Sequence, residues 1–218
     1  MPTTSNCTHN HILLTMNKKL TLIACIAMAA IATPAYADGL IGEDYAYVGG
    51  GYRNVESGPN GLLGTVGANF AVHTGPEYGI DVHTSYGQVH LSTMGDKFRS
   101  HVLSVDLRGH TVMGTTKPFA EFNTGWQWDR TVIGPTKTTA DSLIWGFTVG
   151  SEFELTDAVS LTPSLSWIRW DDFRANQFSF ELAGHMWVTD TLGVGLAYTL
   201  GEGSDLTHTG EATVTFRF

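Results

Sequence analysis

The strongest constraint on this chain is a regular alternation of apolar and polar residues, in runs of about ten residues. Between 143 and 154, Leu143, Trp145, Phe147, Val149 and Phe153 take one set of alternate positions, while glycine, threonine and glutamate take the other. Successive side chains of a β-strand point to opposite faces, so this period predicts strands with one apolar and one polar face. Helical spacing is almost absent, which indicates an all-β fold.

The alternation recurs ten times after residue 44. Seven runs are clear and span 80–86, 103–108, 120–129, 143–154, 178–188, 192–200 and 211–218. Three further runs, near 45–54, 62–73 and 160–170, are less regular, and Gly49-Gly50-Gly51 leaves the facing of the first one open. The links between runs alternate between short turns and longer polar segments, the latter near 55–61, 91–99, 130–139, 171–176 and 201–209.

The length of the runs separates a membrane barrel from a soluble sandwich. Soluble strands usually have about 5–6 residues, whereas a tilted strand that crosses a bilayer needs about 9–11. Lipid does not tolerate an open sheet edge, so such strands must close into a barrel. We therefore expect a closed, antiparallel, up-and-down transmembrane β-barrel of ten strands, with eight strands as the alternative if two weak runs are misassigned.

Aromatic residues are expected to form two belts on this barrel, one at each membrane interface. Trp170 and Phe180 lie near the longer links, and Tyr45, Phe70 and Phe218 lie near the short turns. The residues that we assign to the aromatic girdle are Trp126, Trp128, Trp145, Trp167, Phe178, Tyr78 and Phe153.

The first 37 residues are expected to be a leader and no part of the fold. Lys18 and Lys19 precede an apolar run from 20 to 31, and a small-residue cleavage site ends at Ala37, as in a secretory signal peptide. We expect translation to start at Met16, with 1–37 as extension and signal peptide and 38–218 as a single barrel domain. The 181 residues after Ala37 contain no cysteine and carry a formal charge of −11, which argues against nucleic-acid binding.

The chain ends in Thr213-Val214-Thr215-Phe216-Arg217-Phe218, with apolar residues at alternate positions before a terminal phenylalanine. This segment resembles the last strand of small bacterial outer-membrane β-barrels and porin-like proteins. The resemblance implies residence in the bacterial outer membrane, contact with its lipid, and recognition of Phe216 and Phe218 as an assembly signal by the barrel-assembly machinery.

The polar face of each run is expected to line the interior. The facing of Arg53 and Arg169 stays open at this point. Because acidic residues outnumber basic ones on this face, we expect a small passive channel for solutes or ions with weak cation preference, or a barrel plugged by its own side chains that has a structural role. The candidate lumen-facing residues are Asp81, Asp106, Arg108, Glu121, Glu152, Glu181 and Arg217.

Two alternative functions remain open from the sequence. One is a closed barrel that binds partners through its outer loops. The other is a lipid-modifying enzyme, because His83-Thr84-Ser85 is similar to the His-x-Ser of outer-membrane lipid A deacylases, with His83 and Ser85 as catalytic candidates. So short a motif is weak, and an interior hydrogen-bonding role is favoured over catalysis. We expect no enzyme activity, no cofactor and no metal site, since the histidines show no ligand spacing.

Overall fold

The computed structural model describes residues 41–218 except 57, 94, 95 and 204. The leader, the start at Met16 and the cleavage after Ala37 lie outside these residues and stay predictions. No helix long and apolar enough to cross a membrane occurs in the described part of the chain.

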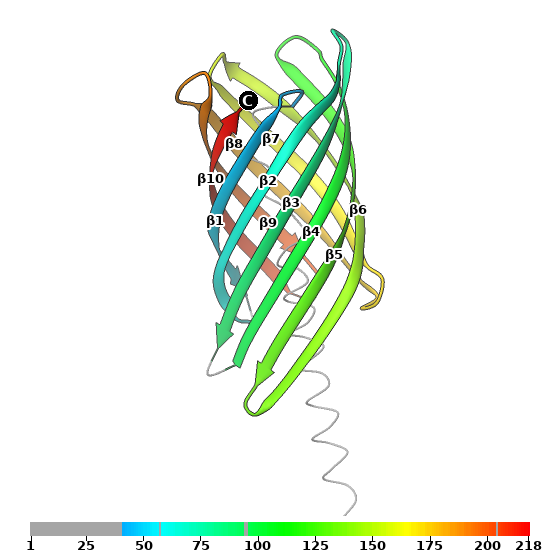
Figure 1. Cartoon of the computed structure of the whole chain (residues 1–218), viewed down its shortest axis with the longest axis vertical. Coiled ribbons are helices and arrows are strands. Elements are labelled where there is room, and N and C mark those ends of the chain that lie inside the picture. Colours follow the sequence, from blue (N-terminus) through cyan, green and yellow to red (C-terminus); the bar gives the residue numbers. More distant parts are fainter. Residues whose placement is uncertain (1–40, 57, 94–95, 204) are drawn as a thin grey trace, which may run out of the picture.

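Ten antiparallel strands form one closed barrel, in which each strand pairs with its neighbours in sequence and β1 pairs with β10 (Figure 1). This confirms the ten-strand prediction over the alternative of eight. The strands are β1 (Tyr45–Val55), β2 (Asn60–Thr74), β3 (Tyr78–Thr93), β4 (Asp96–Thr111), β5 (Thr116–Ile133), β6 (Thr136–Thr156), β7 (Val159–Trp170), β8 (Ala175–Trp187), β9 (Leu192–Glu202) and β10 (Leu206–Arg217).

The two faces of the barrel wall differ in the way that alternation predicts. On β4, Leu103, Val105 and Leu107 are 48%, 49% and 53% exposed on the outside, while Asp106 and Arg108 between and beside them are each 1% exposed on the inside. Large apolar residues cover the outside of all ten strands. An outward apolar surface on a closed barrel is suited to lipid, which solvates these side chains as water would not.

The two ends of the barrel also differ. We call the end that carries the C-terminus and the start of β1 the turn end, and the opposite end the loop end (Figure 1). The β5–β6 hairpin projects furthest at the loop end, since these strands contain 18 and 21 residues. A long polar loop was expected over 130–139, and this is wrong: β5 and β6 remain paired from Arg130↔Thr139 to Ile133↔Thr136. The hairpin extends through this segment, so its backbone N–H and C=O groups stay paired between β5 and β6.

Candidate functional site: the barrel interior

The interior has two zones of different chemistry. Near the turn end lies a polar zone, which includes Asp81, His83, Asp106, Arg108 and Glu121 on adjacent strands β3, β4 and β5. Near the loop end lies an apolar zone. It consists of the buried residues Val55, Val89, Leu91, Phe98, Val102, Ile144, Ile168 and Trp170, with Leu63, Phe173 and Ala175 packed against them.

Arg108 and Glu121 form a buried ion pair in the polar zone. The register of β4 and β5 places them directly opposite each other. The Nε and Nη2 atoms of Arg108 donate to Oε2 of Glu121 at 2.9 and 2.7 Å, and the side-chain amide of Asn123 donates to the other carboxylate oxygen. Two charges removed from water need this degree of compensation to be tolerated.

His83 is held by two partners, Asp106 on the adjacent strand β4 and Tyr47 on β1. Its Nδ1 lies 2.9 Å from Asp106 Oδ2, and its Nε2 lies 3.2 Å from the hydroxyl of Tyr47, whose ring is stacked on the imidazole. Ser85 instead shares a 2.8 Å hydrogen bond with Ser104. Asp106 thus supplies an acidic partner that the sequence alone did not reveal, because it comes from the next strand.

This arrangement does not form a catalytic triad. The two ring nitrogens of His83 face Asp106 and Tyr47, and Ser85 Oγ is bonded to Ser104, so the imidazole is not placed to take a proton from Ser85 Oγ. His83 and Ser85 also lie on the inner face, where they are 0% and 7% exposed, away from lipid outside the wall. The geometry favours the hydrogen-bonding role.

The segment before β1 enters the turn-end mouth of the barrel. The amide N–H of Ile41 donates to Glu152 Oε2 at 3.1 Å, and that of Gly42 donates to Asp81 Oδ2 at 3.2 Å. Lys117 Nζ donates to the carbonyl of Ile41 at 3.1 Å and pairs with Glu154. Lumen carboxylates thus hold the start of the described chain inside the mouth, which no sequence pattern indicated.

The two remaining lumen candidates lie in different settings. Glu181 is buried and accepts a 2.8 Å hydrogen bond from the hydroxyl of Thr199 on β9. Arg217 lies at the rim, where its side chain is 34% exposed, its Nε is 3.6 Å from Glu43, and its guanidinium covers the Trp187 ring. Arg53, left unassigned from the sequence, is buried and donates to Thr209, whereas Arg169 is outside and pairs with Asp171.

Small hydroxyl side chains cover the interior opposite the charged strands. They are buried and point inward, and the alternating Ser and Thr of β7 and β10 are the sequence pattern that corresponds to this wall. These residues are Ser160, Thr162, Ser164, Ser166, Ser179, Thr199, Thr207, Thr209, Thr213 and Thr215. Such a wall offers hydrogen bonds to water or a polar solute without adding charge.

Two aromatic residues expected near the outer belts lie inside the barrel. Trp170 is 1% exposed, and its indole N–H donates to Gln127 Oε1 at 2.8 Å. Tyr45 is 2% exposed beside Tyr47. The belt assignment was wrong for both because it considered only how near each residue lies to a turn, and not which face of the strand it occupies. On β7, Trp167 and Arg169 occupy outward positions, so Trp170 points inward.

The girdle residues assigned from the sequence lie on the outer wall. Trp126, Trp128, Phe178, Tyr78 and Phe153 are exposed on the outside. Trp145 and Trp167 are half-buried because their rings meet edge to face, with centroids 5.1 Å apart.

The C-terminal residues Phe216 and Phe218 are also exposed on the outer wall. Phe218 is hydrogen-bonded to the residue before β1, since its N–H donates to the carbonyl of Asp44 at 3.3 Å.

No group of three or more His, Cys, Asp or Glu side chains that could hold a metal ion occurs within residues 41–218 as far as they are described. The interior carboxylates are instead engaged by arginine, histidine, hydroxyl and amide donors.

Comparison with known proteins identifies the fold. No family model matches the chain, and no curated protein matches it. Among solved structures, an outer-membrane channel from Pseudomonas putida F1 matches with a TM-score of 0.54 and 9% identity, over 86% of this chain and 100% of the channel. The β domain of the Bordetella autotransporter BrkA matches with a TM-score of 0.51 and 10% identity, over 81% of this chain and 99% of that domain. The transport unit of the autotransporter AIDA-I from Escherichia coli matches with a TM-score of 0.51 and 11% identity, over 91% of this chain and 98% of the transport unit.

At these identities the likeness concerns the fold. All three structures are barrels of the bacterial outer membrane, and the closed sheet and apolar outer wall of this chain are of the same kind. The chain therefore has the fold of the bacterial outer-membrane β-barrels.

Proposed function

We propose that this outer-membrane β-barrel is a narrow passive channel for small solutes or ions, with a weak preference for cations. The observation that carries the proposal is the charge of the inner wall. Seven buried carboxylates face two buried arginines, Arg53 and Arg108, an excess of five. A lumen wall of negative sign lowers the barrier for cations and raises it for anions. The seven are Asp81, Asp106, Glu121, Asp129, Glu152, Glu181 and Glu211.

The apolar zone supports the narrowness of this channel. Aliphatic and aromatic side chains from β1, β3, β4, β6 and β7 meet in one cluster at the loop end. A hydrophobic constriction resists wetting and therefore limits ion flow. A solute that comes from outside would cross this zone, beside which Asp129 is buried, before it reaches the more highly charged polar zone.

The remaining partners follow from the same architecture. Outer-membrane lipid surrounds the apolar outer wall. The exposed Phe216 and Phe218 of the last strand support recognition by the barrel-assembly machinery, which reads such a strand in the family that this chain resembles.

Planar-bilayer recordings of the purified protein test the channel. We expect a small conductance whose reversal potential in a KCl gradient shows cation preference. Replacing Glu181 and Glu211 together by glutamine should roughly halve the ratio of cation to anion permeability, because two lumen charges are lost. Glu202→Gln is the matched control, since Glu202 is exposed on the outer wall, and it should leave the ratio unchanged. Clear anion selectivity would refute the proposal.

A second variant separates a narrow channel from a closed barrel. Trp170→Ala removes the largest side chain of the apolar zone, so it should raise the conductance. If both the native protein and Trp170→Ala give flat traces, the channel is contradicted, and a structural or partner-binding barrel is supported.

A further inference from the structure

Basic side chains gather on the outer wall at the loop ends of β3, β4 and β5. The strand register places His90 directly opposite Arg99, and Arg99 directly opposite Arg130. We call these three residues the basic row. Lys97 follows two residues further toward the loop end of β4. The row, like Lys97, is exposed, at outward positions of the wall.

The basic row lacks anionic partners in the protein. Directly opposite like charges on neighbouring strands destabilise a sheet. Other cations of this chain are compensated: Arg169 pairs with Asp171 at 3.0 Å and Lys117 pairs with Glu154 at 2.8 Å. Within the described residues, Arg99 and Arg130 form no ion pair with any carboxylate. An anion from outside the chain would relieve their mutual repulsion.

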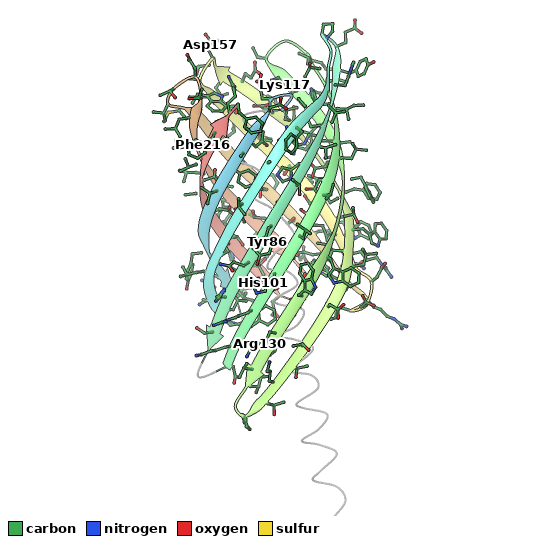
Figure 2. The ribbon with its side chains drawn as sticks, in the orientation of Figure 1. Tyr86, His101, Lys117, Arg130, Asp157 and Phe216 are labelled. Carbon is green, nitrogen blue, oxygen red and sulfur yellow. The ribbon has the colours of Figure 1, made fainter. Side chains whose placement is uncertain are left out.

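The position of the row matches the surface of a bilayer. One outward position toward the middle of the barrel lie Gln88, His101 and Trp128 on the same three strands, and Tyr86 follows on β3. On β4 the next outward residues, Leu103, Val105 and Leu107, are apolar. Tyr86 and His101 are stacked, with the hydroxyl 2.7 Å from Nδ1. Figure 2 shows Tyr86, His101 and Arg130 at successive levels toward the loop end. Amphipathic rings of this kind lie at headgroup level in membranes.

The cluster is local to one side of the wall. On β8, Asn176 lies one outward position beyond Phe178, and on β9 Glu202 lies directly opposite Phe178. The chain as a whole is acidic, with a formal charge of −9. Two directly opposed arginines that form no ion pair are therefore a specific feature of the β3–β5 side among the described residues.

We propose that the basic row binds the phosphate groups of a phosphorylated glycolipid of the lipid A type in the outer leaflet. Guanidinium groups match phosphate oxygens with paired N–H donors. Directly opposite residues have Cβ atoms about 4.5–5.5 Å apart, so both arginines can contact one headgroup. The apolar positions on the membrane side of Tyr86, His101 and Trp128 then lie alongside the acyl chains. This inference does not depend on whether the lumen conducts.

The test measures lipid binding to the folded barrel in detergent, by native mass spectrometry with lipid A carrying both phosphates and with the same lipid after phosphate removal. Arg99→Gln combined with Arg130→Gln should weaken binding of the phosphorylated lipid by about tenfold or more, since basic residues at a membrane surface each contribute appreciably to binding of anionic lipid. The matched control, Arg169→Gln combined with Arg174→Gln, removes the same charge from the loop end and should bind like the native protein.

Folding of each variant is checked by its heat-dependent shift in gel mobility. Equal binding of phosphorylated and phosphate-free lipid by the native protein would overturn the proposal, as would native-like binding by the double variant of the basic row. Displacement of the lipid by millimolar inorganic phosphate would also overturn it, because the row would then be a site for soluble anions.

Discussion

At the scale of single residues, an ion pair between a basic and an acidic side chain contributes differently to stability at different depths in this barrel. Arg108 and Glu121 are 1% and 0% exposed, whereas Lys117 and Glu154 are 17% and 40% exposed at the turn-end rim. Removing one partner of a buried pair leaves an uncompensated charge, while an exposed pair exchanges its partner for water at little cost.

Glu121→Leu should therefore lower the free energy of unfolding by about 3–5 kcal/mol, because Arg108 is left buried without its carboxylate. Glu154→Gln, the rim control, should change it by less than about 1 kcal/mol. Urea-induced unfolding of the barrel in lipid vesicles measures both. Similar effects at the two positions would mean that water reaches Arg108 freely.

Residue facing could be predicted from sequence only where a strand alternates without interruption. The parity of β4 placed Asp106 and Arg108 inside, and they are buried. Trp170 was misplaced because nearness to a link outweighed parity. The contacts of His83 with Asp106 and Tyr47 join residues 23 and 36 positions apart in sequence. They depend on the strand register and barrel closure, which the alternation of residues does not reveal.

At the scale of elements, close contact between strands explains where glycine is required. A Cβ atom on Gly61 of β2 would overlap the carbonyl oxygen of His90 on β3, whereas a Cβ on Gly109 of β4 would meet no atom within 4 Å. The first glycine permits the strands to approach, and the second has open space beside it.

Gly61→Ala should reduce the folded fraction of the barrel, since β2 and β3 would have to separate at a backbone contact that cannot give way. Gly109→Ala should fold like the native protein, with at most a small stabilisation from lower chain entropy in the unfolded state. Heat-dependent gel mobility after refolding into detergent compares the two. A native yield from Gly61→Ala would show that the register at this point is different.

The number of strands was predictable because each carries its own alternation, even where the alternation is weak, as in β1 and β7. The length of the hairpins was not. Polar segments such as 130–139 were expected to be loops because polarity on both faces is common in loops, yet strands that rise above the lipid are also polar on both faces.

At the scale of the whole molecule, the even number of strands puts both ends of the barrel domain at the turn end. If the chain is exported as its sequence predicts, we expect the turn end to face the periplasm and the loop end to face the exterior. The β5–β6 hairpin is then the part of the described chain that reaches furthest from the cell.

A cysteine at Pro135 should react with a membrane-impermeant maleimide on intact cells, because this residue is exposed at the tip of the β5–β6 hairpin. A cysteine at Asp157, exposed at the turn end, should react only after the outer membrane is permeabilised. Both native cysteines, Cys7 and Cys25, lie in the expected leader, so its removal leaves no background thiol. The reverse labelling pattern would contradict the orientation.

Because β1 pairs with β10, the first strand of the barrel to be synthesised cannot complete its pairing until the last strand has been synthesised. Eleven residue pairs join the two strands, from Tyr45↔Arg217 to Val55↔Thr207. Until those final residues arrive, both margins of the sheet have bare peptide groups that the hydrocarbon cannot solvate. A chain truncated before β10 would therefore leave two unpaired sheet edges, which a bilayer does not tolerate.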